Sequence, residues 1–208
     1  FVCTNEKFRE QEHESSAISL TLLKAMESMD RTPLSEKESY YLDLFLFCFY
    51  CGGMAPIDAA YLTWPCIDTK KHKITYERTK TPKKAQPVFV PRAEKIVEKY
   101  RNHCYGNFVL PIFGKQHDTH KKKKNRMGYM CDLVNAALRR IVGILGFDEE
   151  ITWYSARGTY ITMMVDQKCS PEVVAKHAGC SVSTLYKYYW KNLRESEIIA
   201  ELCEEFSD

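Results

Sequence analysis

An apolar run at residues 40–50 constrains the fold more than any other feature of this chain. It contains a single charged residue and is too short to cross a bilayer, which takes about 20 apolar residues. Ser35 and Glu38 stand just before it in the spacing of a capping box, and a pair of glycines follows it at residues 52–53. The sequence therefore predicts a buried helix that ends at the glycine pair.

Other helices are predicted from apolar spacing and from residues typical of helix ends. Pro56 and Pro171 suit the first position of a helix, Gly179 suits a stop, and Ser181 can cap the helix that carries Tyr189. The predicted helices cover residues 18–29, 56–62, 92–101, 133–145, 157–165 and 171–178.

The pattern changes between residues 63 and 90, where short extended runs at 73–76 and 87–90 flank a turn rich in Lys and Pro. Such runs predict a small antiparallel hairpin sheet. Residues 105–126 are irregular and basic, and we interpret them as a mobile loop. The predicted fold class is mainly α with a small antiparallel β-sheet (α+β), without a central parallel sheet.

The chain has 208 residues, which suits one sizeable domain with a short appendage. Its 45% hydrophobic and 27% charged residues are typical of a soluble globular protein. Because it begins at Phe1 and shows no signal peptide, we expect a fragment. Residues 1–15 are predicted to be a linker or the end of a missing N-terminal DNA-binding domain, residues 16–192 the main domain, and residues 193–208 an acidic helical tail.

Nine cysteines in a chain of this length do not predict a disulfide scaffold. The number is odd, and Cys131 and Cys203 stand in apolar helical patterns, where cysteine packs as a small hydrophobe. Reduced thiols and a cytoplasmic location are therefore expected. Cys48 and Cys51 have a zinc-like spacing without a second pair nearby, so we interpret them as packing residues and predict no metal site.

Positive charge is concentrated although the net charge is only +3. Arg78, Lys80, Lys83 and Lys84 form one basic patch, and residues 121–126 form another. Concentrated positive charge favours contact with a phosphate backbone. The alternative is a solvated loop, which we favour for the 121–126 run taken alone.

Three short segments near the C-terminal end carry a motif. They are Tyr154-Ser155-Ala156-Arg157, Ala178-Gly179-Cys180 and Tyr188-Tyr189, and Tyr189 follows Arg157 by 32 residues and Cys180 by nine. This layout resembles the His-x-x-Arg box, the Leu-Gly-His turn and the nucleophilic tyrosine of the tyrosine recombinase (phage integrase) family. The resemblance covers roughly residues 16–192.

The resemblance implies a role for each matching residue. Tyr189 would be the nucleophile, Arg157 the clamp on the phosphoryl oxygens, and Lys80 the acid toward the departing 5′ oxygen. Each residue also has a structural alternative. Tyr189 could belong to an aromatic packing cluster, Arg157 could pair with a carboxylate at a helix start, and Lys80 could be a solvated turn residue.

Several positions depart from the family pattern. Tyr154 and Cys180 stand where the family has histidine, and both can donate a hydrogen bond. The family's first arginine would fall at Ala55 or Gly52, neither of which is basic. Arg78 and Arg92 are the arginines that could replace it.

Taken together, these features predict the catalytic domain of a tyrosine recombinase or integrase from a mobile element. It would cut and rejoin double-stranded DNA through a 3′-phosphotyrosyl intermediate, as an oligomer on DNA and without a metal or nucleotide cofactor. One alternative is a DNA-binding relative that has lost catalysis. Another is a helical interaction domain unrelated to DNA.

Overall fold

The computed structural model of the protein describes residues 17–186. The helices in this range are α1 (Leu20–Ser28), α2 (Glu36–Tyr50), α3 (Pro56–Tyr61), α4 (Pro91–Tyr100), α5 (His120–Ile144), α6 (Ser155–Asp166), α7 (Pro171–Ala178) and α8 (Val182–Leu185). The strands are β1 (Ile67–Asp68), β2 (Lys73–Ile74), β3 (Tyr76–Glu77) and β4 (Lys84–Ala85), and two 3₁₀ turns are η1 (Trp64–Cys66) and η2 (Arg101–His103).

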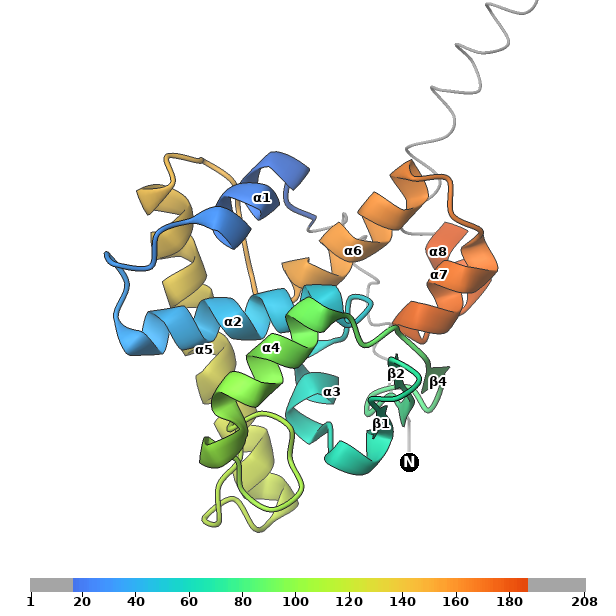
Figure 1. Ribbon diagram of the computed structural model, residues 1–208, viewed down its shortest axis with the longest axis horizontal. Coiled ribbons are helices and arrows are strands. Elements are labelled where there is room, and N and C mark those ends of the chain that lie inside the picture. The colour runs from blue at the N-terminus through green and yellow to red at the C-terminus, as the bar shows by residue number, and fades with distance from the viewer. Residues whose placement is uncertain (1–16, 187–208) are drawn as a thin grey trace, which may run out of the picture.

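Helix α2 crosses the middle of the molecule and packs against α4, α5 and α6 (Figure 1). Its residues 42–49 are all buried, which confirms the buried helix predicted from the apolar run. The capping box is also present: the Ser35 side chain accepts from the Glu38 backbone N–H, and the Glu38 carboxylate accepts from the Ser35 backbone N–H. Helix α2 is therefore the element around which the others are arranged.

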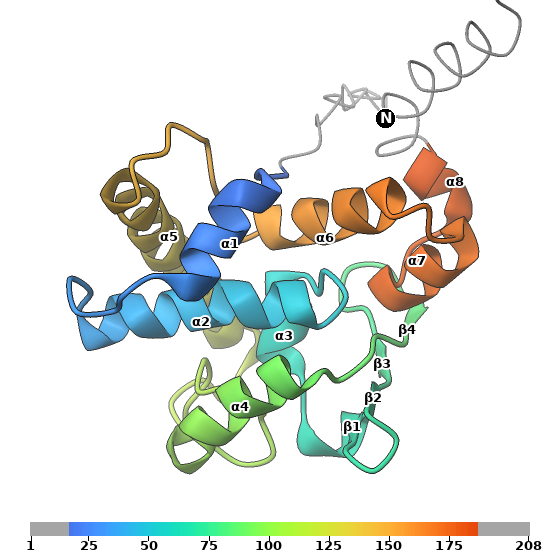
Figure 2. The ribbon, with the colours of Figure 1, turned by 45° about the horizontal axis from the view of Figure 1, so that its top comes forward.

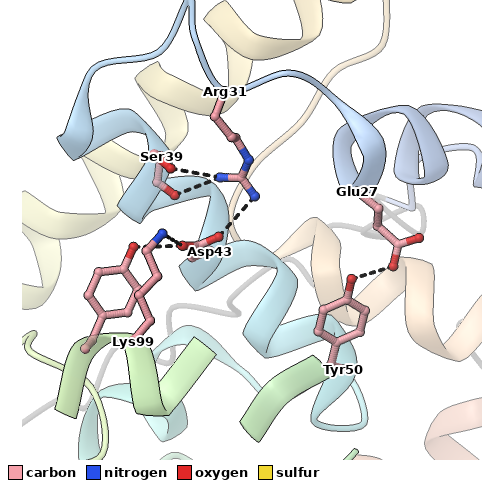
Figure 3. Close-up of polar contacts among 7 residues, drawn as sticks. Glu27, Arg31, Ser39, Asp43, Tyr50 and Lys99 are labelled. Carbon is pink, nitrogen blue, oxygen red and sulfur yellow. Dashed lines mark hydrogen bonds and ion pairs between the residues drawn. The ribbon is translucent and has the colours of Figure 1, made fainter. Parts of the chain in front are cut away.

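One charged side chain, Asp43, lies within the buried part of α2. Its carboxylate accepts hydrogen bonds from Arg31 Nη2 at 3.1 Å, Lys99 Nζ at 2.7 Å and the Tyr100 hydroxyl at 2.7 Å (Figure 3). A buried carboxylate is tolerated only when such partners replace water. These bonds tie α4 and the segment after α1 to the central helix.

The region between residues 63 and 90 forms two small antiparallel ladders, β1 with β2 and β3 with β4. The predicted antiparallel sheet is confirmed, but it is divided rather than a single hairpin. Residues 87–90 run beside β2, where Pro87 accepts from Ile74 N and Phe89 donates to His72 O. Proline has no N–H to donate, so the ladder does not continue through it.

Helix α5 begins at His120, so the prediction of a loop through residue 126 is wrong for its last seven residues. Thr119 caps the first turn with its side chain. Lys123 Nζ lies 5.4–5.6 Å from the centres of three aromatic rings, those of Tyr61, Phe108 and Phe113. These cation–π contacts hold part of the basic run against the protein.

Helices α6, α7 and α8 follow one another at the C-terminal side, with α6 alongside α2 and α7 near β4 (Figure 2). Ser170 caps α7, Pro171 stands at its start, and Gly179 ends it with φ +62°, as predicted. Gln86, just after β4, donates its backbone N–H to Lys176 O at 2.9 Å. The last turn of α7 is therefore held against the chain that leaves the β3–β4 ladder.

None of the helices between residues 17 and 186 is long and apolar enough to span a bilayer. The seven cysteines in the same range are free thiols. Cys48 and Cys51 are fully buried in the core, and burial raises the pKa of both thiols. Both therefore pack as apolar side chains.

Candidate active site

Arg157 lies in the first turn of α6 and is almost completely buried, with 4% of its surface exposed. Its Nη1 donates to Gly53 O at 3.0 Å and to Ala178 O at 2.8 Å. Within residues 17–186 it forms no ion pair with a carboxylate, in contrast to the structural alternative considered from the sequence. The guanidinium thus brings a buried positive charge to the point where α6, the end of α2 and the turn after α7 meet.

Gly53 is what allows the chain after α2 to approach Arg157 so closely. Its φ is +66°, and a Cβ at this position would lie 3.1 Å from the Cα and from the backbone oxygen of Arg157. A larger residue would strain the backbone and push the two segments apart. The glycine pair therefore shapes the site as well as ending the helix. The sequence indicated only the helix end.

Arg78 reaches the same turn from the β3–β4 hairpin. Its Nη1 donates to Gly179 O at 3.2 Å, and its Nε donates to Asp58 Oδ2 at 3.3 Å. The other oxygen of Asp58 accepts from the backbone N–H of Thr79 at 2.7 Å. The Arg78 side chain is only 11% exposed, so it is set deeper than the lysines of the same basic patch, and its contact with DNA stays a prediction.

Cys180 stands beside these arginines, at the position of the histidine in the family's turn. Burial raises the pKa of its thiol, and the positive charges of Arg157, Arg78 and Lys83 oppose that rise without cancelling it. The side chain is therefore a neutral thiol near pH 7, which is a weak hydrogen-bond donor and not a cation.

Tyr76 contributes a buried hydroxyl near the same groups. Burial, followed by the charge of Asp58, raises its pKa, while Arg157 and Arg78 act in the opposite direction. Its oxygen has no hydrogen-bond partner in the part of the chain that the structure describes. Nothing in the sequence singled out Tyr76, because its environment depends on residues distant along the chain.

The remaining predicted site residues are more exposed. Tyr154 precedes α6 and is 48% exposed, without a side-chain bond to the helix end. Lys80, Lys83 and Lys84 are exposed on the hairpin that carries Arg78. Tyr189, the predicted nucleophile, lies outside the described residues. The structure thus brings Arg157, Arg78 and Cys180 together and leaves the convergence of Lys80 and Tyr189 a prediction.

Arg92 does not join this group. It pairs with Glu27 of α1 at 2.6 Å and lies over the ring of Tyr50. The Tyr50 hydroxyl also donates to Glu27, as Figure 3 shows. It lines a pocket of about 560 Å³ between α1, α2 and α4. Of the two replacements for the first arginine considered from the sequence, only Arg78 contacts the turn after α7.

Neither position expected for the family's first arginine offers room for a long side chain. Gly52 has φ +73°, and a Cβ there would lie 2.7 Å from Pro87 Cβ and 3.3 Å from His177 O. Ala55 is 2% exposed at the start of α3. A guanidinium at either position would require the surrounding backbone to move.

His177, in the last turn of α7, is a histidine that the sequence motif did not include. Its Nδ1 lies 2.8 Å from the Tyr160 hydroxyl. Burial, assisted by Lys176, lowers the pKa of its ring. The ring therefore faces α6 as a neutral group and does not take the place of the missing turn histidine.

Comparison with solved structures places recombinases and integrases among the similar folds. The XerA recombinase is 14% identical with a TM-score of 0.59, over 95% of this chain and 66% of that chain. The Tn1549 transposon integrase in complex with transposon right end DNA is 10% identical with a TM-score of 0.61, over 100% of this chain and 71% of that chain. The XerH site-specific recombinase bound to difH substrate is 16% identical with a TM-score of 0.60, over 93% of this chain and 55% of that chain.

These structural neighbours are tyrosine recombinases, and the chain has their fold. The predicted fold, a mainly helical domain with small antiparallel sheets like that of tyrosine-recombinase catalytic domains, is confirmed. No protein-family model and no curated protein sequence matches the chain. The chain spans 66% of the XerA chain and 55% of the XerH chain.

Proposed function

We propose that this chain is the catalytic domain of a site-specific DNA recombinase or integrase, which cuts and rejoins strands through a 3′-phosphotyrosyl intermediate. One observation carries the proposal: a buried arginine, Arg157, without a carboxylate partner in residues 17–186. Taking a cation out of water costs several kcal/mol unless an opposite charge compensates it. A phosphodiester that binds at this point would supply that charge.

In this proposal the phenol of Tyr189 gives its proton to water, its oxygen attacks the scissile phosphorus, and the bond from phosphorus to the 5′ oxygen breaks. Lys80 gives a proton to the departing 5′ oxygen, and Arg157 stabilises the charge on the non-bridging oxygens. A phenol has a pKa of about 10, so a cationic site favours its ionised form. The 5′ hydroxyl of another strand reverses the step.

Double-stranded DNA is the proposed partner, and assembly on DNA as an oligomer is part of the proposal. The exposed Lys83 and Lys84 on the β3–β4 hairpin support DNA contact, because exposed cations near a phosphate site extend its positive field along the backbone. The phosphotyrosyl bond retains the energy of the phosphodiester, so the reaction needs no metal or nucleotide cofactor. A role in a mobile element is part of the proposal and follows from the same resemblance.

Specific observations also favour a second candidate, a DNA-binding relative without catalysis. Gly52 leaves no room for the first arginine, and Cys180 is a neutral thiol where the family has histidine. Loss of one preorganised donor to a charged transition state costs roughly 3 kcal/mol, or about a hundredfold in rate. Two such losses would reduce strand cleavage to a very low level while DNA binding continued.

Formation of a covalent protein–DNA adduct separates the two candidates. Duplexes that bind the protein are first enriched from a randomised pool. A nick is then placed a few nucleotides beyond each candidate scissile phosphate. Cleavage releases the short fragment that carries the 5′ hydroxyl, and because this fragment diffuses away, the adduct accumulates. The protein is then incubated with them and resolved on a denaturing gel. An adduct that Tyr189→Phe abolishes supports the recombinase, and binding without an adduct supports the non-catalytic relative.

Arg157→Ala is expected to suppress the adduct as well and to weaken binding to the phosphate backbone. Tyr188→Phe is the matched control, because it removes a neighbouring phenol. An adduct that survives Tyr189→Phe and disappears in Tyr188→Phe would move the nucleophile by one residue.

A further inference from the structure

Two guanidinium groups bind successive carbonyl oxygens of one turn. Arg157 Nη1 donates to Ala178 O at 2.8 Å, and Arg78 Nη1 donates to Gly179 O at 3.2 Å. The positive charges of both arginines also oppose the rise in the pKa of the neighbouring Cys180 thiol, which follows from this closeness. The end of α7 thus binds both arginines, although Arg78 and Arg157 are 79 residues apart in sequence.

The charges of this group do not balance among the described residues. Asp58 is the carboxylate that pairs with Arg78, and its side chain is 1% exposed. Arg157 has no carboxylate of its own in residues 17–186, and Lys83 adds a third positive charge nearby. Partly buried cations in excess of their counterions favour binding of an anion. With Asp58 as their one carboxylate, these three cations leave two positive charges uncompensated, and a phosphodiester group would bring one negative charge to them.

Each guanidinium also keeps donors for such an anion. A guanidinium has five N–H groups in a planar fork. Within residues 17–186, Arg157 donates hydrogen bonds from Nη1, and Arg78 donates from Nε and Nη1. The remaining N–H groups suit the two non-bridging oxygens of a phosphate, because paired N–H donors match that geometry.

The fold holds the Arg78 guanidinium between Asp58, which binds its Nε, and Gly179, whose carbonyl oxygen accepts from its Nη1. Asp58 binds the guanidinium with one oxygen and the backbone N–H of Thr79 with the other, so it sets the start of the hairpin turn as well. Gly179 makes room for the side chain, because a Cβ there would lie 2.8 Å from Arg78 Cδ. A side chain held this firmly is preorganised for its ligand.

We infer that Arg78 is a catalytic residue that binds the scissile phosphate beside Arg157 and supplies the charge that the family places at the position of Gly52 or Ala55, with Asp58 as its positioning residue. This inference rests on the proposed function. It explains how the site could act without the family's first arginine, for which Pro87 leaves no room at Gly52. Arg78 approaches the same turn from the hairpin side instead of from the end of α2.

The test compares Arg78→Ala with the parent chain on two nicked duplexes of the same sequence. One carries an ordinary phosphodiester at the scissile position, and the other a methylphosphonate, in which a methyl group replaces one charged oxygen. A group that neutralises phosphate charge becomes dispensable when that charge is removed. A residue that only supports the fold is needed on both substrates.

Arg78→Ala is expected to slow adduct formation about a hundredfold on the phosphodiester. At least tenfold of that loss should return on the methylphosphonate. Arg139→Ala, at an exposed arginine of α5, should match the parent on both substrates. Arg78→Lys keeps the charge without the fork, so it should retain the fold and lose an intermediate factor on the phosphodiester.

Each other outcome overturns the inference. If the parent forms the adduct and Arg78→Ala forms it at a rate within threefold, Arg78 is not a clamp, although the proposed function stands. If Arg78→Ala is equally impaired on both substrates, or fails to fold while Arg78→Lys is as fast as the parent, its role is structural. If the parent forms no adduct on either duplex, the proposed function falls and this inference falls with it.

Discussion

Replacing Gly179 by alanine should destabilise the domain more than the same change at Gly146. Both glycines end a helix with positive φ, +62° at Gly179 and +75° at Gly146. A left-handed conformation costs an L-residue about 1–2 kcal/mol, so both variants lose that amount. The surroundings differ, because a Cβ at Gly146 meets nothing within 4 Å.

At Gly179 the new Cβ would lie 2.7 Å from Ala85 Cβ and 2.8 Å from Arg78 Cδ. Carbon atoms pack favourably at about 3.5–4.0 Å, so the hairpin must shift. Overpacking of this kind costs about 1–3 kcal/mol. The expected loss in the free energy of unfolding is therefore about 2–5 kcal/mol for Gly179→Ala and about 1–2 kcal/mol for Gly146→Ala.

Urea unfolding followed by circular dichroism measures both losses under the same conditions. An unchanged slope with denaturant would show that the comparison concerns stability and not compactness. Equal losses for the two variants would contradict the close packing of the turn after α7 against the hairpin. Gly179→Ala should also displace Arg78 and slow adduct formation, whereas Gly146→Ala should not.

Three further predictions follow from the charges and the pKa shifts. Affinity for duplex DNA should be weak and should fall by more than about tenfold between roughly 50 and 200 mM salt, and titration at several salt concentrations would refute this if affinity stayed constant. Burial lowers the pKa of His177 in the folded protein, so the unfolded chain binds the proton more readily. The neutral His177 ring therefore contributes its full stability above the unfolded pKa of about 6.5. This contribution is lost as the pH falls through the folded pKa. Thermal unfolding between pH 7.5 and 5.5 should therefore show a smaller loss for His177→Gln than for the parent, and His103→Gln, at an exposed position, should behave as the parent does. Lys80→Ala should lose adduct formation on ordinary DNA and regain it when sulfur replaces the 5′ oxygen, because a thiolate leaves without an acid; no recovery would remove Lys80 from that role.

Features set by neighbouring residues could be predicted from the sequence. The capping box at Ser35 and Glu38 and the glycine stop at Gly179 depend on residues only a few positions apart, and the structure confirms both. The basic first turns of α5 were interpreted as a loop because they carry no apolar period, although Thr119 caps them and Lys123 lies over rings brought from other segments. Local pattern gives the helix ends, and distant packing decides the ambiguous runs.

The candidate site shows the same division. Arg157 could be predicted from the motif, but its carbonyl partners come from the end of α2 and from the turn after α7. The sequence grouped Arg78 with the lysines of a basic patch and could not choose between Arg78 and Arg92 as the replacement arginine, because the pairing of Arg78 with Asp58, 20 residues earlier, forms only in the folded chain. Spacing identifies which residues share a motif, whereas burial and pairing depend on the folded chain.

The most direct test of the proposed chemistry is to identify the amino acid that becomes attached to DNA. The adduct formed on a nicked duplex is digested with protease and nuclease, and the linked peptide is sequenced by mass spectrometry. The account predicts a nucleotide joined through its 3′ phosphate to Tyr189, with no such peptide from Tyr189→Phe or Arg157→Ala. Attachment to a different residue, or a chain that binds the duplex and never becomes linked to it, would contradict the account.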